Sequence, residues 1–160
     1  MKYAHFSKCG VYRYSLKRDI PCILRWVKPI LFIMLNPSTA DEVNNDPTIR
    51  RCISFAEKHA CTDLYVVNLF ALRATDPREL KKHRDPIGEQ NDDIIDKMIF
   101  RIRAENGFVV AAWGAHPMAQ ERGRQLTEKH GPFVCLGTTK GGAPRHPLYV
   151  KSKQKFMEYL

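Results

Sequence analysis

A chain of 160 residues has the length of one domain and is long enough to bury a hydrophobic core. Its hydrophobic content of 44% and charged content of 27% are ordinary for a globular protein and argue against disorder. The net charge of +9 favours a polyanionic partner, nucleic acid first, although a solvated basic surface without a partner accounts for it equally well.

No apolar run approaches the roughly 20 residues that are needed to span a bilayer. The first residues, Met1 to His5, lack the apolar stretch of a secretory signal. We therefore expect a cytoplasmic monomer with no membrane partner. The cysteines include no C-x-x-C pair, so we expect structural cysteines, no metal site and no cofactor. They are Cys9, Cys22, Cys52, Cys61 and Cys135.

Four short apolar runs predict strands, at 30–35, 64–70, 108–113 and 133–136. The runs are near-continuous rather than alternating, which is typical of strands that are covered on both faces in a parallel sheet. Helical patterns alternate with them. The expected helices begin at Asp46-Pro47, Asn91 and Pro117, the second ends at Asn106-Gly107, the third ends at Gly131-Pro132, and a last one covers 151–160.

This alternation predicts an α/β domain over residues 1–160, with three αβα layers around a central parallel four-stranded sheet. The first residues differ: 11–14 and 22–26 predict an N-terminal β-hairpin or edge strands around Lys17–Pro21. The polar stretch 71–90 has little periodicity. A loop of that length in a compact domain is more often functional than idle.

Polar or glycine-rich residues follow each predicted strand. They are 36–39 after the first, Asn68 and Arg73 at the second, 113–116 after the third, and 137–142 with 145–149 after the fourth. Ligands of open α/β sheets bind beyond the carboxyl ends of the strands, so we expect these residues to converge on one rim.

Asn68 has two interpretations. Asparagine is depleted in strands and is costly to bury without a partner. It either satisfies a neighbouring loop, as buried amides often do, or presents a fixed amide with donors and an acceptor to the edge of a base.

Four short motifs occur at these strand ends in a familiar order. They are Met34-Leu35-Asn36-Pro37-Ser38, Val66-Val67-Asn68, Ala112-Trp113-Gly114 and Arg145-His146-Pro147-Leu148. In this order they resemble the motifs of the uracil-DNA glycosylase superfamily, in its mismatch-specific branch with an N-P motif. The chain is also similar to an uncharacterised single-domain family of bacteria and phages. The glycosylase resemblance implies the strand order 2-1-3-4.

The resemblance implies a DNA glycosylase that acts in DNA repair on a flipped, damaged or modified base. By this resemblance the catalytic residues are Asn36, which would position the attacking water, and His146, which would stabilise the leaving base. Donors aimed at the base suit this chemistry, because negative charge builds up there when the bond breaks. A base reaches such a pocket only after flipping out of the duplex. The residues that would contact the base are Asn68, Trp113, Gly114, Pro37 and Ser38.

Basic residues near the predicted rim are the expected contacts to DNA phosphates. They are Arg73, Lys81, Lys82, Arg84, Lys140 and Arg145. The remaining histidines, including His116, share no metal-ligand spacing and are interpreted as surface or turn residues.

Three features depart from the resemblance, and one of them is the shortened loop His146-Pro147-Leu148-Tyr149. Asn36 stands where the fastest branch has aspartate, and asparagine cannot act as a general base. No clear aromatic residue follows the first motif to stack on the base. Two alternatives therefore stay open: a non-catalytic nucleic-acid or nucleotide-binding module, and an enzyme that acts on free nucleosides or nucleotides.

Overall fold

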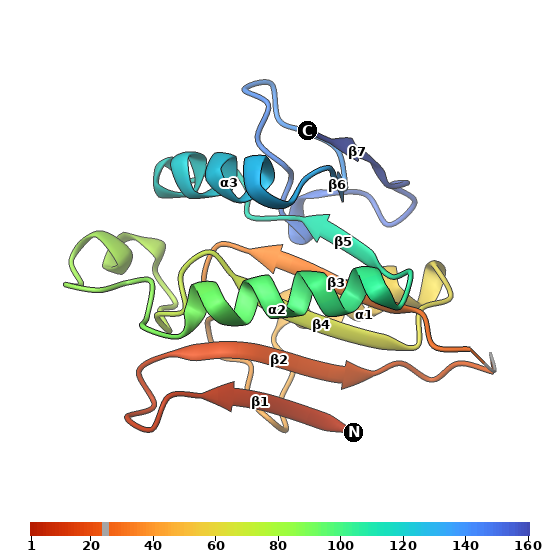
Figure 1. Cartoon of the computed structure of the whole chain (residues 1–160), viewed down its shortest axis with the longest axis horizontal. Coiled ribbons are helices and arrows are strands. Elements are labelled where there is room, and N and C mark those ends of the chain that lie inside the picture. Colours follow the sequence, from red (N-terminus) through yellow and green to blue (C-terminus); the bar gives the residue numbers. More distant parts are fainter. Residues whose placement is uncertain (24–25) are drawn as a thin grey trace.

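The sheet of this protein has seven strands. The computed structural model describes residues 1–23 and 26–160, and Figure 1 shows the strands side by side in the order β1-β2-β4-β3-β5-β6-β7. Their bounds are β1 (Lys2–Phe6), β2 (Arg13–Asp19), β3 (Pro29–Met34), β4 (Asp63–Asn68), β5 (Phe108–Ala111), β6 (Phe133–Cys135) and β7 (Met157–Tyr159).

The four strands predicted from the apolar runs form the centre of this sheet. β3, β4, β5 and β6 are mutually parallel neighbours in the order β4-β3-β5-β6. The predicted four-stranded parallel sheet is nevertheless wrong as a whole, because the sheet is mixed. Antiparallel β2 and β1 extend it beyond β4, and antiparallel β7 extends it beyond β6. These additions pair the backbone groups that an exposed edge strand would leave open.

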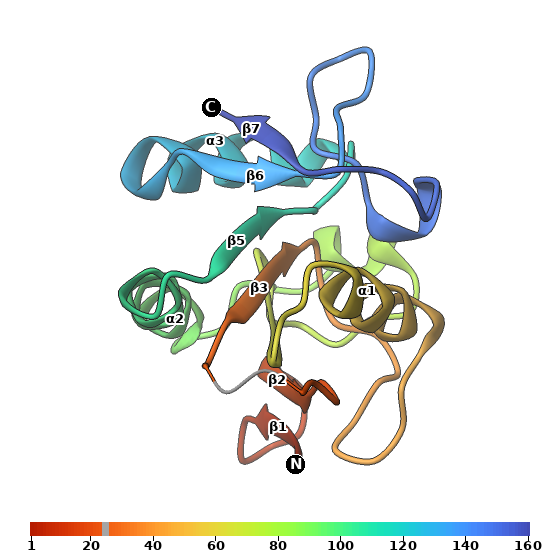
Figure 2. The same ribbon diagram turned by 90° about the vertical axis from the view of Figure 1, so that its right-hand side faces the viewer.

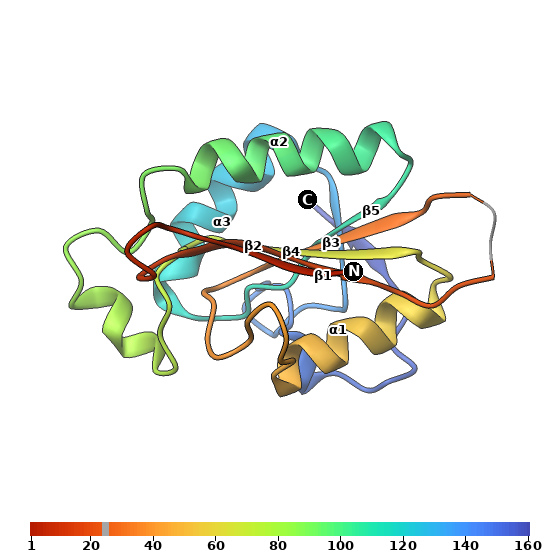
Figure 3. The same ribbon diagram turned by 90° about the horizontal axis from the view of Figure 1, so that it is seen from below.

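The helices cover both faces of the sheet. Figure 3 shows α1 (Pro47–Lys58) on one face, and α2 (Asn91–Ala104) with α3 (Pro117–His130) on the other. Two short 3₁₀ helices, η1 (Pro77–Lys81) and η2 (Pro147–Tyr149), lie in the connections. Figure 2 shows η2 and the C-terminal segment beside α1. The α/β class and the three layers are confirmed.

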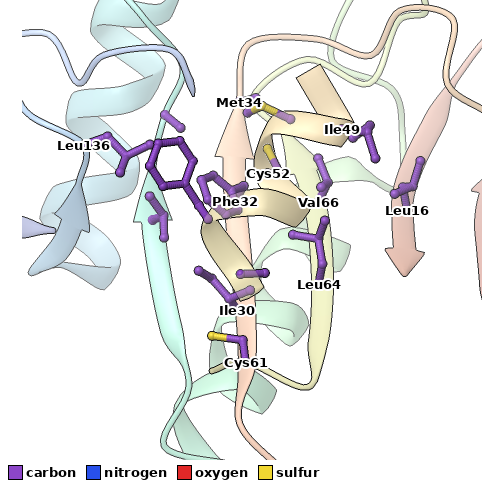
Figure 4. Packing of buried hydrophobic residues seen from close by; sticks show 14 of the residues in the cluster. Leu16, Ile30, Phe32, Met34, Ile49, Cys52, Cys61, Leu64, Val66 and Leu136 are labelled. Atoms are coloured by element: carbon purple, nitrogen blue, oxygen red, sulfur yellow. The ribbon is translucent and has the colours of Figure 1, made fainter. Parts of the chain in front are cut away.

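Each face of the sheet has its own hydrophobic core. On the α1 face, Ile49 and Cys52 of the helix pack on Phe32 and Val66 of the central strands (Figure 4). On the other face, Ile95 and Ile99 of α2 are among the residues packed with the opposite side of the same strands. Strands that are buried on both faces explain the near-continuous apolar runs of the sequence.

An N-terminal β-hairpin is present, but its strands and its turn are not the predicted ones. The hairpin joins β1 to β2 and turns through residues 7–12, so that Lys17 lies inside β2 instead of at a turn. Cys22, Ile23 and Trp26 are not in a strand, and Leu24 and Arg25 of the expected strand 22–26 lie outside the described residues.

The predicted last helix, 151–160, is instead an irregular segment followed by β7. A ten-residue helix is marginal on its own. As a strand, these residues pair with the edge of β6, while Phe156 packs against Phe108 and Tyr159 against Trp113.

The long polar stretch 71–90 is an ordered loop. It contains η1, buries Leu80 completely and is tied back by hydrogen bonds between Ala71 and Ile87 and between Leu72 and Pro86. In the described part of the chain, none of the helices combines the length and the apolar character that a bilayer crossing requires.

Candidate functional site

A cavity of about 270 Å³ opens at the carboxyl ends of β3 and β5. Residues that directly follow these strands line it, together with residues at the start of α1, η1, α3 and η2. Each of these four helical segments begins with a capping Asp or His followed by proline: Asp46-Pro47, Asp76-Pro77, His116-Pro117 and His146-Pro147. The cap accepts an N–H that the first turn leaves free, and proline has no N–H to satisfy.

Asn36 lines the cavity in a fixed orientation. Its Nδ2 donates to the carbonyl oxygens of Pro37, at 3.1 Å, and Ala74, at 2.8 Å. Because both donors of the amide point at the backbone, Oδ1 is its remaining hydrogen-bonding group. Asn36 therefore offers the cavity an oriented acceptor.

His146 lines the same cavity, although 110 positions separate it from Asn36. Its Nδ1 accepts from the backbone N–H of Leu148 at 3.2 Å, which leaves the proton of the neutral ring on Nε2. Burial lowers the pKa of His146 below its ordinary value, and the carboxylate of Asp46 opposes this only in part. Near neutral pH, His146 is thus a neutral N–H donor.

The sequence analysis interpreted His116 as a surface or turn residue, and the structure places it half-buried in the connection before α3. His116 lines the cavity and caps α3 as His146 caps η2, with Nδ1 accepting from Met118 at 3.3 Å. The signal that could have identified it is the repeated His-Pro pair, which occurs in the connection after β5 and again in the connection after β6.

Arg13 was also missed. It lies at the start of β2, is only 2% exposed, and lines the cavity. Its Nη1 donates to the carbonyl oxygen of Ala40 at 2.6 Å, and its Nε has no partner among the described residues. Burial lowers the pKa of Arg13 to about 10. No sequence signal marks this arginine as a site residue, because residues 11–14 were predicted only as part of a hairpin or edge strand, with no neighbour in the central sheet assigned to them.

Asn68 does not line the cavity. It ends β4, is 1% exposed, and pairs in register with Met34, which does line the cavity. Paired residues of neighbouring strands point to the same face, so Asn68 lies on the face of Met34 and of α1. Neither Nδ2 nor Oδ1 of Asn68 has a partner among the described residues.

Some of the residues that were predicted to contact the base line the cavity, and others do not. Trp113, Gly114 and Ser38 line the cavity, whereas Pro37 is buried outside its lining. A Cβ on Gly114 would lie 3.7 Å from Cβ of His146, so these two residues are immediate neighbours. Ser38 Oγ donates to Asp46 Oδ2 at 3.0 Å.

Tyr149 supplies an aromatic ring that the sequence comparison did not find. It lines the cavity, is 79% exposed, and has its ring centroid 5.6 Å from that of His146. An exposed ring at a cavity wall is available to a planar ligand.

The basic residues of the predicted rim are exposed. Arg73 contacts the carbonyl oxygen of Gly10 and the ring of Phe6, and Arg145 donates to the carbonyl oxygen of Thr138. The side chains of the other four form no hydrogen bond or ion pair within residues 1–23 and 26–160; they are those of Lys81, Lys82, Arg84 and Lys140. Lys81 ends η1, whose Pro77 lines the cavity.

Comparisons with known proteins place the chain without assigning it an activity. No curated protein and no solved structure matches it. The model of one family matches residues 13–148, a span that includes Arg13, Asn36, His116 and His146. Since this span is most of the chain, the protein belongs to the family described as "Protein of unknown function (DUF1643)".

Proposed function

We propose that this protein hydrolyses the N-glycosidic bond of a damaged or modified DNA base that flips into the cavity. One observation carries the proposal: Asn36 and His146 line one cavity with side chains whose orientations are fixed by backbone hydrogen bonds. The motif order in the sequence, which resembles the uracil-DNA glycosylase superfamily, is the second support.

The proposed step divides the chemistry between these two residues. Water attacks C1′ of the sugar, the bond from C1′ to the base nitrogen breaks, and its electron pair leaves with the base. Asn36 Oδ1 accepts a hydrogen bond from the water and aligns it, and the water's proton passes to solvent because an amide is no base. The Nε2–H of His146 donates to the base oxygen on which negative charge develops.

The pocket walls support a planar substrate. Trp113 closes one side, and Gly114 leaves room beside His146 because it lacks a side chain. The exposed ring of Tyr149 is the proposed stacking partner for the base.

The test is a screen of the purified protein against duplex and single-stranded DNA carrying different damaged and modified bases, scored by alkali-sensitive strand breaks. For a base that is excised, we expect Asn36→Ala and His146→Ala each to lower kcat by about 10² to 10³, as loss of one oriented group does elsewhere. His83→Ala is the matched control, because His83 is exposed and lies outside the cavity.

The outcomes separate the alternatives. Breaks that depend on Asn36 and His146 support the proposal. Salt-dependent DNA binding without breaks on any base contradicts it and favours a binding module. Turnover of free nucleosides or nucleotides, with no activity on DNA, contradicts it and favours a nucleotide enzyme.

A further inference from the structure

Arg13 carries a positive charge into the interior of the protein without an ion pair. It is 2% exposed, and no carboxylate within the described residues lies within ion-pair distance of it. A buried guanidinium that lacks a counter-charge is costly, because its lost hydration is not replaced. Because Arg13 lines the cavity, a ligand in the cavity can supply the negative charge that the protein does not place beside it.

The hydrogen bonds of Arg13 leave one edge of its guanidinium unoccupied. Nη1 donates to Ala40, and Nε is buried without an acceptor. Nη2 makes no hydrogen bond within the described residues and is not among the buried unpartnered atoms, so its N–H groups are the charged donors that Arg13 offers to a phosphate or a carboxylate in the cavity.

Arg18, the other buried arginine of β2, differs from Arg13 because its guanidinium is hydrogen-bonded along both edges. It is equally buried, at 2% exposed. Its Nε donates to Asn45 Oδ1 at 2.7 Å, and its other nitrogens donate to backbone carbonyl oxygens, including that of Asp41. Arg18 does not line the cavity. The unoccupied edge is thus specific to the arginine at the cavity.

The surroundings of Arg13 favour negative charge. The N-termini of α1 and α3 both border the cavity, and helix N-termini carry a partial positive charge. Asp46 is the acidic residue of the lining, and its oxygens already accept from Ile49 N and Ser38 Oγ. The lining histidines, His116 and His146, are N–H donors on Nε2 when neutral.

We propose that Arg13 and the adjacent starts of α1 and α3 form an oxyanion subsite in the cavity, which binds a phosphate or carboxylate group of the substrate. The inference rests on the proposed function only in placing the substrate in this cavity. It adds that the part of the substrate bound there is itself negatively charged.

The test is a titration of the unmodified protein with inorganic phosphate, followed by the ¹H–¹⁵N signal of Arg13 Nε–H. Arg13→Lys identifies that signal by its loss. We expect a saturable shift of the Arg13 signal at constant ionic strength, with no comparable shift for Arg18. An Arg13 signal that phosphate and acetate both leave unchanged would overturn the proposal.

Variants give a second, independent measurement. By calorimetry, Arg13→Gln should weaken phosphate binding by about ten- to a hundredfold, the range for a hydrogen-bonded charge. Arg103→Gln removes an exposed charge of α2 that lies outside the cavity lining, and it should leave binding within twofold. Equal affinity of Arg13→Gln and the unmodified protein would contradict the subsite even if Arg13→Lys does not fold.

Comparing the affinities of matched ligands identifies whether the bound oxyanion is a phosphate or a carboxylate. A nucleoside 5′-monophosphate that binds more tightly than its nucleoside identifies a phosphate, and acetate competing more strongly than phosphate identifies a carboxylate on the base. Neither result depends on turnover. Phosphate binding without glycosylase activity would contradict the proposed function and support the subsite. Glycosylase activity without phosphate binding would support the proposed function and contradict the subsite.

Discussion

At the scale of single residues, two buried polar side chains beside the cavity lack partners. Asn68 has both amide atoms unbonded, and Arg13 has a free Nε, in the part of the chain that the structure describes. An unsatisfied buried group costs about 1–3 kcal/mol of stability. Such groups next to a cavity are expected where a site is maintained at the expense of stability.

Replacing Asn68 with leucine tests this directly. Leucine has a similar volume and no polar atoms, so Asn68→Leu should leave the free energy of unfolding unchanged or raise it by up to about 1–2 kcal/mol. Substrate binding should weaken in the same variant, because Asn68 pairs in register with Met34, which lines the cavity. Denaturant unfolding and a binding titration on one sample measure both. A clear loss of stability would mean that Asn68 holds a loop and plays no part in the site.

The lowered pKa of His146 makes stability depend on pH. Burial favours the neutral ring, so between the folded pKa and the ordinary value of 6.5 the unfolded chain binds more protons. The contribution of His146 is therefore complete above pH 6.5 and is lost as the pH falls through the folded pKa.

His146→Asn retains a cap acceptor for Leu148 but cannot titrate. We expect the variant to lose less stability than the unmodified protein between neutral and acidic pH. Some dependence remains, because burial also lowers the pKa of His59. Thermal unfolding across this pH range measures the difference, and identical pH profiles would contradict the account.

The residues of the site differ in how far the sequence could reveal them. Asn36 and His146 were accessible because each directly follows a strand or lies in a recognisable motif. Arg13 was not, because its exposure and pairing depend on β2 joining the sheet beside β4, a long-range contact that no local pattern encodes. Asn68 was identified, but its separation from the cavity lining depends on packing.

At the scale of elements, α3 holds the tryptophan wall of the cavity through a glycine. A Cβ on Gly123 would come within 2.7 Å of the indole ring of Trp113, which also packs edge-on against Phe133 and Tyr159. Glycine in a helix interior costs about 1 kcal/mol relative to alanine. The close packing of the indole offsets that cost.

Gly123→Ala should therefore destabilise the protein, although alanine is the better helix former. We expect a lower melting temperature and reduced activity, because Trp113 has to move. Gly141→Ala is the control, since a Cβ there would only reach an ordinary contact with Thr139 at 3.9 Å. A melting temperature that rises in Gly123→Ala would show that the indole has space to relax.

The central strands could be predicted at this scale, and the terminal elements could not. Burial on both faces leaves a continuous apolar signature in β3, β4 and β5. β7 is three residues long and includes the charged Glu158, so its identity comes from the edge of β6 that it covers. β1 is similar, because its sequence, Lys2-Tyr3-Ala4-His5-Phe6, has no continuous apolar run and its place in the sheet comes from its pairing with β2.

At the scale of the whole molecule, the net charge is +9, and the basic residues differ in whether an acidic residue pairs with them. Cations of α2 and α3 form ion pairs, as Lys97 does with Asp93 and Arg124 with Glu121. Lys81 and Lys82 have no such partner within the described chain. They lie at the end of η1, whose first residue lines the cavity. Unpaired cations are the ones available to phosphates.

Lys81→Ala with Lys82→Ala should weaken DNA binding and reduce the slope of log K against log salt by up to about one unit per lost phosphate contact. Lys58→Ala with Lys97→Ala removes the same charge; Lys58 ends α1 at the end opposite the cavity. This control should change the slope less. Equal slopes in both variants would assign Lys81 and Lys82 to bulk solvent.

The four prolines that open the segments around the cavity determine how it can respond to a ligand. Each fixes its own φ angle, and each follows a capping side chain that is already bonded. Much of the ordering entropy of this rim is therefore lost during folding and not during binding. Association should proceed in one kinetic phase whose observed rate rises linearly with ligand concentration, without the plateau that a slow loop closure imposes.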